Sequence, residues 1–305
     1  MKYITFRNKQ GRIAAGWIDN DVVVDMYEAS NGELPIDLVS FLEKEEACRG
    51  LVDKLADSLN TEDAGVYRIE EVDLLAPLPR PVSVRDFYAF EEHVKTARAK
   101  RGLEVVPEWY GIPVFYFTNH LAIKGPDEEV ARPKNSEWLD YELEIACVIG
   151  KQGRNIPAAE ADDYIFGYCI MNDWSARDLQ RQEMKVGLGP AKGKDFATSI
   201  GPWLVTKDEL IPFQKDRRYD LEMKAAVNGK VLSEGNFETI HYSFAEMIER
   251  ASADVTLYPG EVIGSGTVGT GCILELGTDV HRWLEPGDEV SLEITGLGKL
   301  TNKII

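Results

Sequence analysis

Two glutamates near the middle of the sequence, Glu142 and Glu144, carry the first sign of chemistry. They stand two residues apart in segment 139–150, where Leu143 and Ile145 alternate with acidic residues, and this period of two predicts a β-strand. Side chains two apart on a strand share a face, so the carboxylates should lie side by side. Like charges that close repel unless a cation lies between them. The pair indicates a cation site, and a half-exposed strand with two solvated glutamates is the alternative.

Two more acids stand out in the sequence. Asp173 lies in the polar run of residues 171–180, which reads Met-Asn-Asp-Trp-Ser-Ala-Arg-Asp-Leu-Gln. Glu275 lies between two leucines in segment 272–276, whose pattern predicts a strand. An acid at an apolar-flanked strand position needs a partner, because an unpaired buried charge is costly.

A helix is predicted over residues 87–101, with Asp86 at its N-cap position. His93 follows Asp86 by seven residues, which is two helical turns, so both should lie on one face. Tyr88 and two glutamates crowd the same segment. Considered alone, His93 could equally be an exposed helical histidine beside those glutamates.

Two glycine-rich segments look like nucleotide-binding loops but lack the required context. In segment 186–196, Leu188 stands where a phosphate loop has its first glycine, which leaves Lys194 as a candidate anion contact. Residues 264–269 match GxGxxG, yet a dinucleotide fingerprint must open a helix and a strand is predicted next. We interpret this segment as a tight loop that brings backbone N–H groups and Thr267 to a ligand.

The composition is that of a globular chain of 305 residues, with 44% hydrophobic and 28% charged residues. A net charge of −18 argues against nucleic acid or an anionic membrane as partner, because both need clustered Lys and Arg, and it attracts divalent cations. Four widely spaced cysteines without a CxxC pair exclude a zinc framework or disulfide scaffold. No signal peptide or membrane-spanning run is recognisable, so we expect a cytoplasmic protein.

The elements that position these residues form two predicted domains. Residues 1–30 have the pattern of a small β-meander and residues 35–59 that of helices, which predicts a small α+β N-terminal domain over 1–73. The proline-rich segment 74–81 is a predicted linker, and it opens a mainly β catalytic domain over 74–305.

Strands dominate the second predicted domain. An Asn228-Gly229 hairpin turn and a short helix over 243–251 are predicted, without the regular alternation of a Rossmann sheet or (β/α)₈ barrel. The aromatic segment 108–119 predicts a loop that enters a buried strand, where Tyr110 and Tyr116 could offer hydroxyls to a pocket.

Together these motifs resemble one family, the fumarylacetoacetate hydrolase family, from about Pro77 to the C-terminus. The residues that carry the resemblance are Asp86-Phe87-Tyr88 with His93, Asp140-Tyr141-Glu142-Leu143-Glu144, Met171 through Gln180, Gly193-Lys194 and Ser265-Gly266-Thr267. The resemblance implies the family's β-roll or β-sandwich fold for the C-terminal domain, and a homodimer.

The resemblance also implies roles for the matching positions. The implied metal ligands are Asp86, Glu142, Glu144 and Asp173. The implied catalytic residues are the base His93, its orienting acid Glu275, and Lys194. The implied substrate contacts are Tyr88, Tyr116, Gln180 and Thr267. The family also uses a further arginine, for which Arg98 and Arg101 are the candidates, although neither has the family's spacing. An all-oxygen ligand set favours Mg²⁺, with Ca²⁺ or Mn²⁺ as alternatives.

The implied activity is metal-dependent hydrolysis of a carbon–carbon bond in a fumarylacetoacetate- or acylpyruvate-like diketo acid, in aromatic-compound catabolism. The substrate's oxygens would chelate the metal, His93 would take a proton from water, and Lys194 would stabilise the departing enolate. The family also hosts decarboxylases, isomerases and hydratases of 2-oxo acids, and the fold does not separate these. A non-catalytic, metal-stabilised binding module is the remote alternative.

Overall fold

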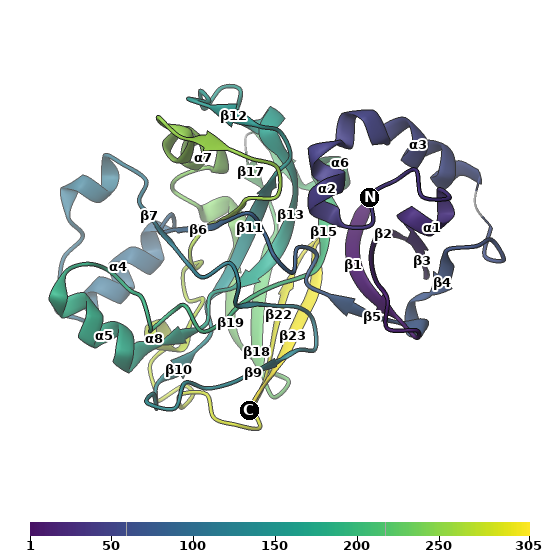
Figure 1. The fold of residues 1–305 in the computed structure, drawn as a ribbon. Helices are drawn as coiled ribbons and strands as arrows, with labels where there is room; N and C mark the ends of the chain where they lie inside the picture. Colours follow the sequence, from purple (N-terminus) through teal and green to yellow (C-terminus); the bar gives the residue numbers. More distant parts are fainter. Residues whose placement is uncertain (59, 217) are drawn as a thin grey trace.

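The computed structural model describes residues 1–58, 60–216 and 218–305, and most of its elements are strands (Figure 1). The prediction of a mainly β protein with few helices is confirmed. The main path of the larger sheet runs through β4 (Val66–Arg68), β3 (Val22–Asp25), β2 (Ile13–Asp19), β1 (Lys2–Asn8), β15 (Thr198–Thr206), β13 (Ile165–Asn172), β11 (Leu143–Ile149), β21 (Val262–Gly264), β6 (Val84–Phe87) and β7 (Phe115–Phe117). Two strands pair off this path, β5 (Val72–Leu75) with β1 and β8 (Ile123–Lys124) with β15.

A second sheet and several helices complete the fold. The second sheet consists of β19 (Lys230–Asn236), β18 (Glu222–Val227), β22 (Glu289–Ile294), β23 (Gly298–Ile304) and β9 (Glu129–Val130). Three two-stranded ladders pair β10 (Leu139–Asp140) with β14 (Ser175–Ala176), β12 (Gly153–Arg154) with β20 (Thr256–Leu257), and β16 (Gln214–Lys215) with β17 (Arg218–Tyr219). The α-helices are α1 (Met26–Ala29), α2 (Leu38–Glu43), α3 (Glu45–Ser58), α4 (Glu91–Ala99), α5 (Arg177–Val186), α6 (Lys207–Leu210), α7 (Phe244–Ser252) and α8 (Ile273–Leu276).

The N-terminal elements form a lobe beside the rest of the chain, drawn in purple and blue in Figure 1. The predicted meander is confirmed as β1–β3, and the predicted helical stretch is α2 and α3; its last residue, Leu59, lies outside the described residues. The large sheet continues across the lobe boundary, since β1 pairs with β15. The predicted linker is wrong at its start, because β5 extends to Leu75 and pairs with β1. The domain boundary at 73/74 stays a prediction.

Strand β11 joins the two larger hydrophobic cores of the described residues, and all seven of its residues are buried. Leu143 and Ile145 belong to the core shared with the second sheet, whereas Ala146 and Val148 pack with the N-terminal elements. A strand covered on both faces carries apolar side chains on both. This explains why apolar residues outnumber polar ones after Glu144.

The predicted continuous strand over 139–150 is wrong, because the strand breaks at residues 141–142. Before the break, β10 pairs with β14; after it, β11 pairs with β13. Residues 173–174 interrupt the facing chain at the same place, between β13 and β14. The two interruptions lie opposite each other, so Glu142 and Asp173 leave their strands at one point.

Three further predictions about local structure are corrected. The helix predicted from residue 87 begins at Glu91, and Asp86 is not its N-cap, because Val84–Phe87 form β6 and pair with β21 and β7. Segment 272–276 is the helical turn α8 rather than a strand, because the Asp140 carboxylate accepts hydrogen bonds from its first N–H groups. Strand β7 is partly exposed rather than buried, with Phe117 at 61% exposure.

The predictions for the later chain are confirmed. Asn228 and Gly229 both have positive φ, as a two-residue hairpin turn requires, and they connect β18 to β19. The predicted short helix is α7, whose N-cap Ser243 forms a capping box with Glu246.

Candidate functional site

The predicted metal-ligating acids lie on or next to three strands, β6, β11 and β13, which β21 helps to hold together at one end of the large sheet. Leu143 at the start of β11 pairs with Asn172 at the end of β13. On the other side, β11 pairs with β21, and Gly264 at the end of β21 pairs with Asp86. Because these ladders place one strand's start beside its neighbours' ends, Asp86, Glu144 and Asp173 reach the same point.

These three carboxylates form a buried cluster. Asp86, Glu144 and Asp173 each offer an oxygen, and these oxygens lie within 4.8 Å of one another. Burial raises the pKa of Asp86 and of Glu144 well above the usual range, and the neighbouring acids add to this. Glu144 Oε2 and Asp173 Oδ1 are buried without a hydrogen-bond partner among the described residues. Orphaned oxygens in a group of like charges fit a hard divalent cation.

The fourth predicted ligand, Glu142, is turned toward two cations of the protein. Its Oε2 lies 2.5 Å from Lys194 Nζ and its Oε1 lies 2.8 Å from Arg177 Nη2. Burial opposes ionisation, yet the Lys194 ammonium and the Arg177 guanidinium hold the pKa of Glu142 below its usual range. The backbone N–H of Glu142 donates to Asn172 Oδ1 at 3.0 Å, which fixes the break in the strand. The three-acid cluster therefore does not include Glu142.

Lys194 connects Glu142 to the cluster, because its ammonium also contacts Asp173. Burial lowers the pKa of Lys194, but Asp173 and Glu142 outweigh this and raise it, so the side chain stays charged. The glycine-rich loop before it is held by Glu183, whose carboxylate accepts the N–H groups of Ala191 and Lys192 at 2.8 and 2.6 Å. Lys194 was a candidate anion contact, and the anions that it and this loop bind in the structure are carboxylates of the protein.

Arg177 and Asp140 belong to the site although sequence reasoning gave neither a role. The Arg177 Nε donates to Asp140 Oδ2 at 2.8 Å, and both side chains are buried. Asp140 also accepts the N–H groups of Ile273 and Leu274 at 2.8 and 3.0 Å. Both residues lie inside motifs that carry the family resemblance, and that was the only available signal. Asp140 joins the carboxylate site to α8.

Helix α8 presents Glu275 to His93 on α4, and the two helices pack together (Figure 1). His93 Nδ1 lies 2.8 Å from Glu275 Oε2, and both side chains are buried. The contact has ion-pair distance, but Nδ1 makes no aligned hydrogen bond within the described chain. The Tyr88 ring stands edge-on to His93 with centroids 5.3 Å apart, and burial raises the pKa of Tyr88 to about 12. The predicted catalytic pair is brought together.

Three of the predicted substrate contacts touch the charged network. The hydroxyl of Tyr116 donates to Asp173 Oδ2 at 2.5 Å, and that of Thr267 donates to Glu144 Oε1 at 3.3 Å. Gln180 Oε1 accepts from Arg177 Nη1 at 3.1 Å.

The other candidates from the same part of the sequence lie apart from this network. Tyr110, which was expected to face a pocket, is 45% exposed and donates to Glu91. Arg98 and Arg101 each donate through Nε to a backbone carbonyl near their own helix.

The glycine at position 264, the last residue of β21, is required by the site itself. A Cβ at this position would lie 2.6 Å from Asp86 Oδ1 and 2.6 Å from Met171 Cε. The segment 264–269, which matches the dinucleotide fingerprint, therefore begins in contact with the carboxylate of Asp86. The helix α8 that follows has four residues and begins only at Ile273.

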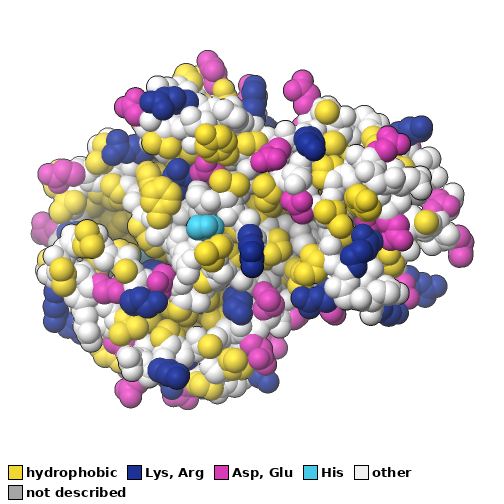
Figure 2. Space-filling model, viewed as in Figure 1, with side chains coloured by type: hydrophobic (Ala, Val, Ile, Leu, Met, Phe, Trp, Pro, Cys, Tyr) yellow, Lys and Arg dark blue, Asp and Glu magenta, His cyan; other side chains and the backbone are white. Residues whose placement is uncertain are grey.

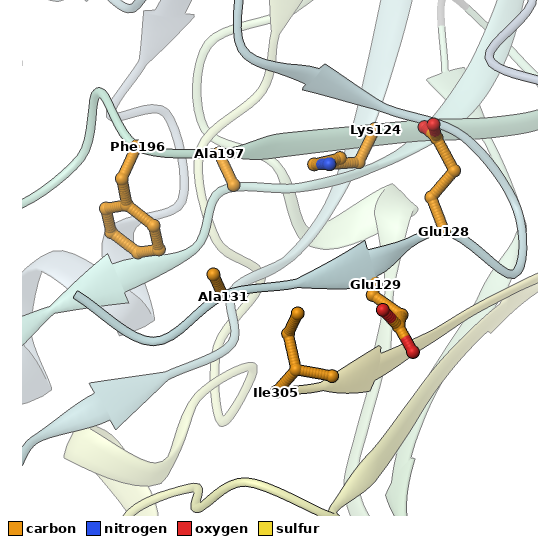
Figure 3. A pocket seen from close by; sticks show the side chains of 7 residues that line it. All are labelled: Lys124, Glu128, Glu129, Ala131, Phe196, Ala197 and Ile305. Atoms are coloured by element: carbon orange, nitrogen blue, oxygen red, sulfur yellow. The ribbon is translucent and has the colours of Figure 1, made fainter. Parts of the chain in front are cut away.

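A separate cavity of about 440 Å³ lies near the C-terminus (Figure 3). It is lined by Lys124, Glu128, Glu129, Ala131, Phe196, Ala197 and Ile305. None of the predicted site residues lines it.

Acidic and basic side chains are interspersed with hydrophobic ones over the face drawn in Figure 2. Within the described residues, every helix is too short or too polar to cross a membrane.

Comparison with known proteins places this geometry in a family. The family described as "Fumarylacetoacetate (FAA) hydrolase C-terminal" matches residues 83–305. The fumarylacetoacetase of Arabidopsis thaliana is 30% identical over 308 residues, covering 78% of this chain and 72% of the relative. The mitochondrial oxaloacetate tautomerase FAHD2A of Bos taurus is 34% identical over 292 residues, covering 93% and 84%.

Solved structures share the fold over the whole chain. The fumarylacetoacetate hydrolase from psychrophilic Exiguobacterium antarcticum has a TM-score of 0.76 at 26% identity and covers 100% of this chain and 99% of its own. The maleylpyruvate hydrolase from Sphingobium sp. SYK-6, in complex with manganese (II) ion and pyruvate, has a TM-score of 0.75 over the same shares. Its identity is 22%, so this likeness concerns the fold alone. The predicted fold of the family, with its small α+β N-terminal part, is confirmed.

Proposed function

The chain belongs to the fumarylacetoacetate hydrolase family, and from this premise we propose that it is a divalent-metal-dependent hydrolase of carbon–carbon bonds. Its substrates are fumarylacetoacetate- or acylpyruvate-like diketo acids from aromatic-compound catabolism. The observation that carries this proposal is the buried contact between His93 and Glu275. Hydrolysis needs an activated water, and a base oriented by an acid supplies that activation.

Three side chains carry the proposed proton transfer and charge stabilisation. His93 accepts a proton from water, and the carboxylate of Glu275 stabilises the imidazolium that forms. The water oxygen bonds to the carbonyl carbon and the adjacent carbon–carbon bond breaks, so its electron pair leaves as an enolate. The Lys194 ammonium stabilises the developing negative charge. The enolate carbon then takes the proton, which yields a carboxylic acid together with a 2-oxo acid from an acylpyruvate, or a 3-oxo acid from a fumarylacetoacetate-like substrate.

A divalent cation would be held by Asp86, Glu144 and Asp173. We propose Glu142 as a further ligand, although in this structure its carboxylate contacts Lys194. When bound, it would supply Lewis-acid charge and a template for the substrate's oxygens. Oxygen donors favour Mg²⁺ or Mn²⁺ over softer ions. Tyr88, Tyr116, Gln180 and Thr267 are proposed to shape the substrate site. We further propose a homodimer.

An isomerase, tautomerase or decarboxylase of 2-oxo acids is the second candidate. It is favoured by one specific observation, that a relative named oxaloacetate tautomerase aligns with 93% of the chain. Proton transfer between carbon and oxygen would need His93 as well, but would need no water attack. The two candidates therefore share a site and differ in the bond that breaks.

The test is a panel of acylpyruvates and oxaloacetate, offered with Mg²⁺ or Mn²⁺ and followed by mass spectrometry. The proposal expects two fragments whose summed mass exceeds the substrate by one water. Loss of CO₂ from oxaloacetate without cleavage of any acylpyruvate would establish the decarboxylase instead. A change in keto–enol absorbance at constant mass would establish the tautomerase.

A further inference from the structure

The thiol of Cys272 lies beside the His93–Glu275 pair and has no part in the proposed reaction. Cys272 Sγ lies 3.4 Å from Glu275 Oε2. One ligand atom from each of His93, Cys272 and Glu275 lies within 4.8 Å of the others, and all three side chains are buried. This places a nitrogen, a sulfur and an oxygen donor around one point.

The donor set differs in kind from that of the three-acid cluster. Asp86, Glu144 and Asp173 offer oxygen alone, which suits hard cations such as Mg²⁺. A thiolate, an imidazole and a carboxylate instead suit Zn²⁺, which is bound by three protein side chains with a fourth position left to water. We propose that His93, Cys272 and Glu275 form an inhibitory site for Zn²⁺, distinct from the site for the catalytic cation.

A second observation points to a ligand at this place. His93 is 4% exposed, and its Nδ1 finds no aligned hydrogen-bond partner in the described chain. A buried ring nitrogen without a hydrogen-bond partner destabilises the folded protein unless a bound group or ion interacts with it. Glu275 Oε2 lies 2.8 Å from this nitrogen, so the ring nitrogen and the carboxylate oxygen face the same space.

Binding of Zn²⁺ requires the thiol of Cys272 to lose its proton. Burial and then the carboxylate of Asp140 raise the pKa of Cys272 well above its usual range, so the resting thiol is protonated. On binding, Zn²⁺ displaces the thiol proton, which passes to solvent, and forms bonds to sulfur, nitrogen and oxygen without oxidation or reduction.

Occupancy would stop the proposed reaction, because both members of the pair become ligands. His93 can then no longer be oriented by Glu275, and Glu275 can no longer stabilise an imidazolium. Excess Mg²⁺ should not relieve this inhibition, since magnesium does not compete for a thiolate. The inhibition rests on the proposed function, whereas binding of the ion does not.

The experiment uses the full chain with Mg²⁺ present and compares the wild type with Cys272→Ser and the control Cys48→Ser. Cys48 is a buried cysteine of the N-terminal lobe, on α3. Titration with Cd²⁺, a thiophilic probe for zinc sites, should give an ultraviolet thiolate-to-metal band at one equivalent in the wild type and in Cys48→Ser. Cys272→Ser should lack that band. The Zn²⁺ concentration for half-inhibition should rise by about tenfold or more in Cys272→Ser only.

The proposal is overturned if the wild type shows no such band, a result that no folding defect of a variant can obscure. It is also overturned if Cys272→Ser or Cys272→Ala is inhibited at the wild-type Zn²⁺ concentration, since zinc would then act at the three-acid cluster. Relief of the inhibition by excess Mg²⁺ would have the same meaning. If the band follows Cys272 but no acylpyruvate is cleaved by any form, the zinc site stands and the proposed function fails.

Discussion

The ammonium of Lys194 lies 2.5 Å from a carboxylate oxygen of Glu142, so a residue expected to ligate a metal is held by a fixed cation of the protein. The same ammonium contacts Asp173 of the three-acid cluster. The site thus carries one permanent positive charge beside the place where a divalent ion fits. That charge is available to an enolate leaving the substrate.

Replacing that charge should separate catalysis from cation binding. We expect Lys194→Met to lower kcat by about 10²- to 10³-fold, because a preorganised positive group is lost from the developing enolate. Affinity for Mn²⁺ should stay the same or increase, since Glu142 and Asp173 lose a competing cation. Calorimetric titration with Mn²⁺ checks the second part, and weaker binding in the variant would contradict it.

Removal of the base should leave the cation site intact. We expect His93→Ala to lower hydrolysis by about 10²- to 10⁴-fold, because the group proposed to accept the proton of water is lost. Mn²⁺ affinity should be nearly unchanged, since His93 pairs with Glu275 rather than with the three acids. His281→Ala is the control, because His281 bonds only to the neighbouring carbonyl of Arg282 in the described structure. Retained turnover in His93→Ala would remove His93 from the mechanism.

Gly264 should be needed for cation binding although it offers no ligand atom. In Gly264→Ala the new Cβ meets Asp86 Oδ1 at 2.6 Å, so the carboxylate must move away from the cluster. We expect Mn²⁺ affinity to fall by about 10- to 100-fold, with the far-ultraviolet circular dichroism unchanged. Gly50→Ala is the matched control, because a Cβ on helix α3 meets nothing within 4 Å. Equal affinities in the two variants would show that Asp86 tolerates the shift.

Asp140 should matter more for stability than an ordinary polar residue. Asp140→Asn leaves the Arg177 guanidinium buried with one partner fewer, and weakens the cap of α8. We expect a loss of about 3 kcal/mol in the free energy of unfolding, measured by denaturant titration. Asp178→Asn, at a half-buried carboxylate that accepts from Ser136 and Glu137, should lose only about 1 kcal/mol. Comparable losses would mean that the Asp140–Arg177 pair contributes no more to stability than the hydrogen bonds of Asp178.

Acid should weaken the turn that precedes the last hairpin, through Asp288. Arg282 binds this carboxylate with two nitrogens at 2.7 and 3.0 Å, and although burial opposes ionisation these and further hydrogen bonds lower the pKa of Asp288 to about 2. A folded-state pKa below the unfolded one adds stability above the unfolded pKa, which is lost as the pH falls from about 4 to about 2.

Asp288→Asn tests this linkage. It should lower the free energy of unfolding by about 2 kcal/mol at neutral pH, and the difference from the wild type should shrink as the pH falls through that range. Glu285→Gln is the control, since Glu285 forms an exposed contact of 3.3 Å with the same arginine and should change stability little. A difference that stays constant with pH would contradict the assignment.

The sequence alone determined which residue types meet in this site and which family they belong to. The residues around Asp86 and His93, the alternation around Glu144, the run of residues 171–180 and the position of Lys194 carry the family resemblance, and the resemblance implies the roles of the acids, the base and the lysine. Local signals also predicted the Asn228-Gly229 turn and the helix after Ser243, because both depend on backbone preferences of a few adjacent residues.

Only the tertiary structure decided how those residues are presented. Periodicity placed Glu142 and Glu144 on one strand, but pairing with two different partners breaks the strand between them and turns Glu142 to Lys194. Asp86 became a strand residue because β6 pairs with β21, and Glu275 became helical because distant Asp140 caps its turn. These outcomes depend on hydrogen bonds between residues far apart in the chain. Such bonds override local propensity, and the local sequence pattern does not reveal them.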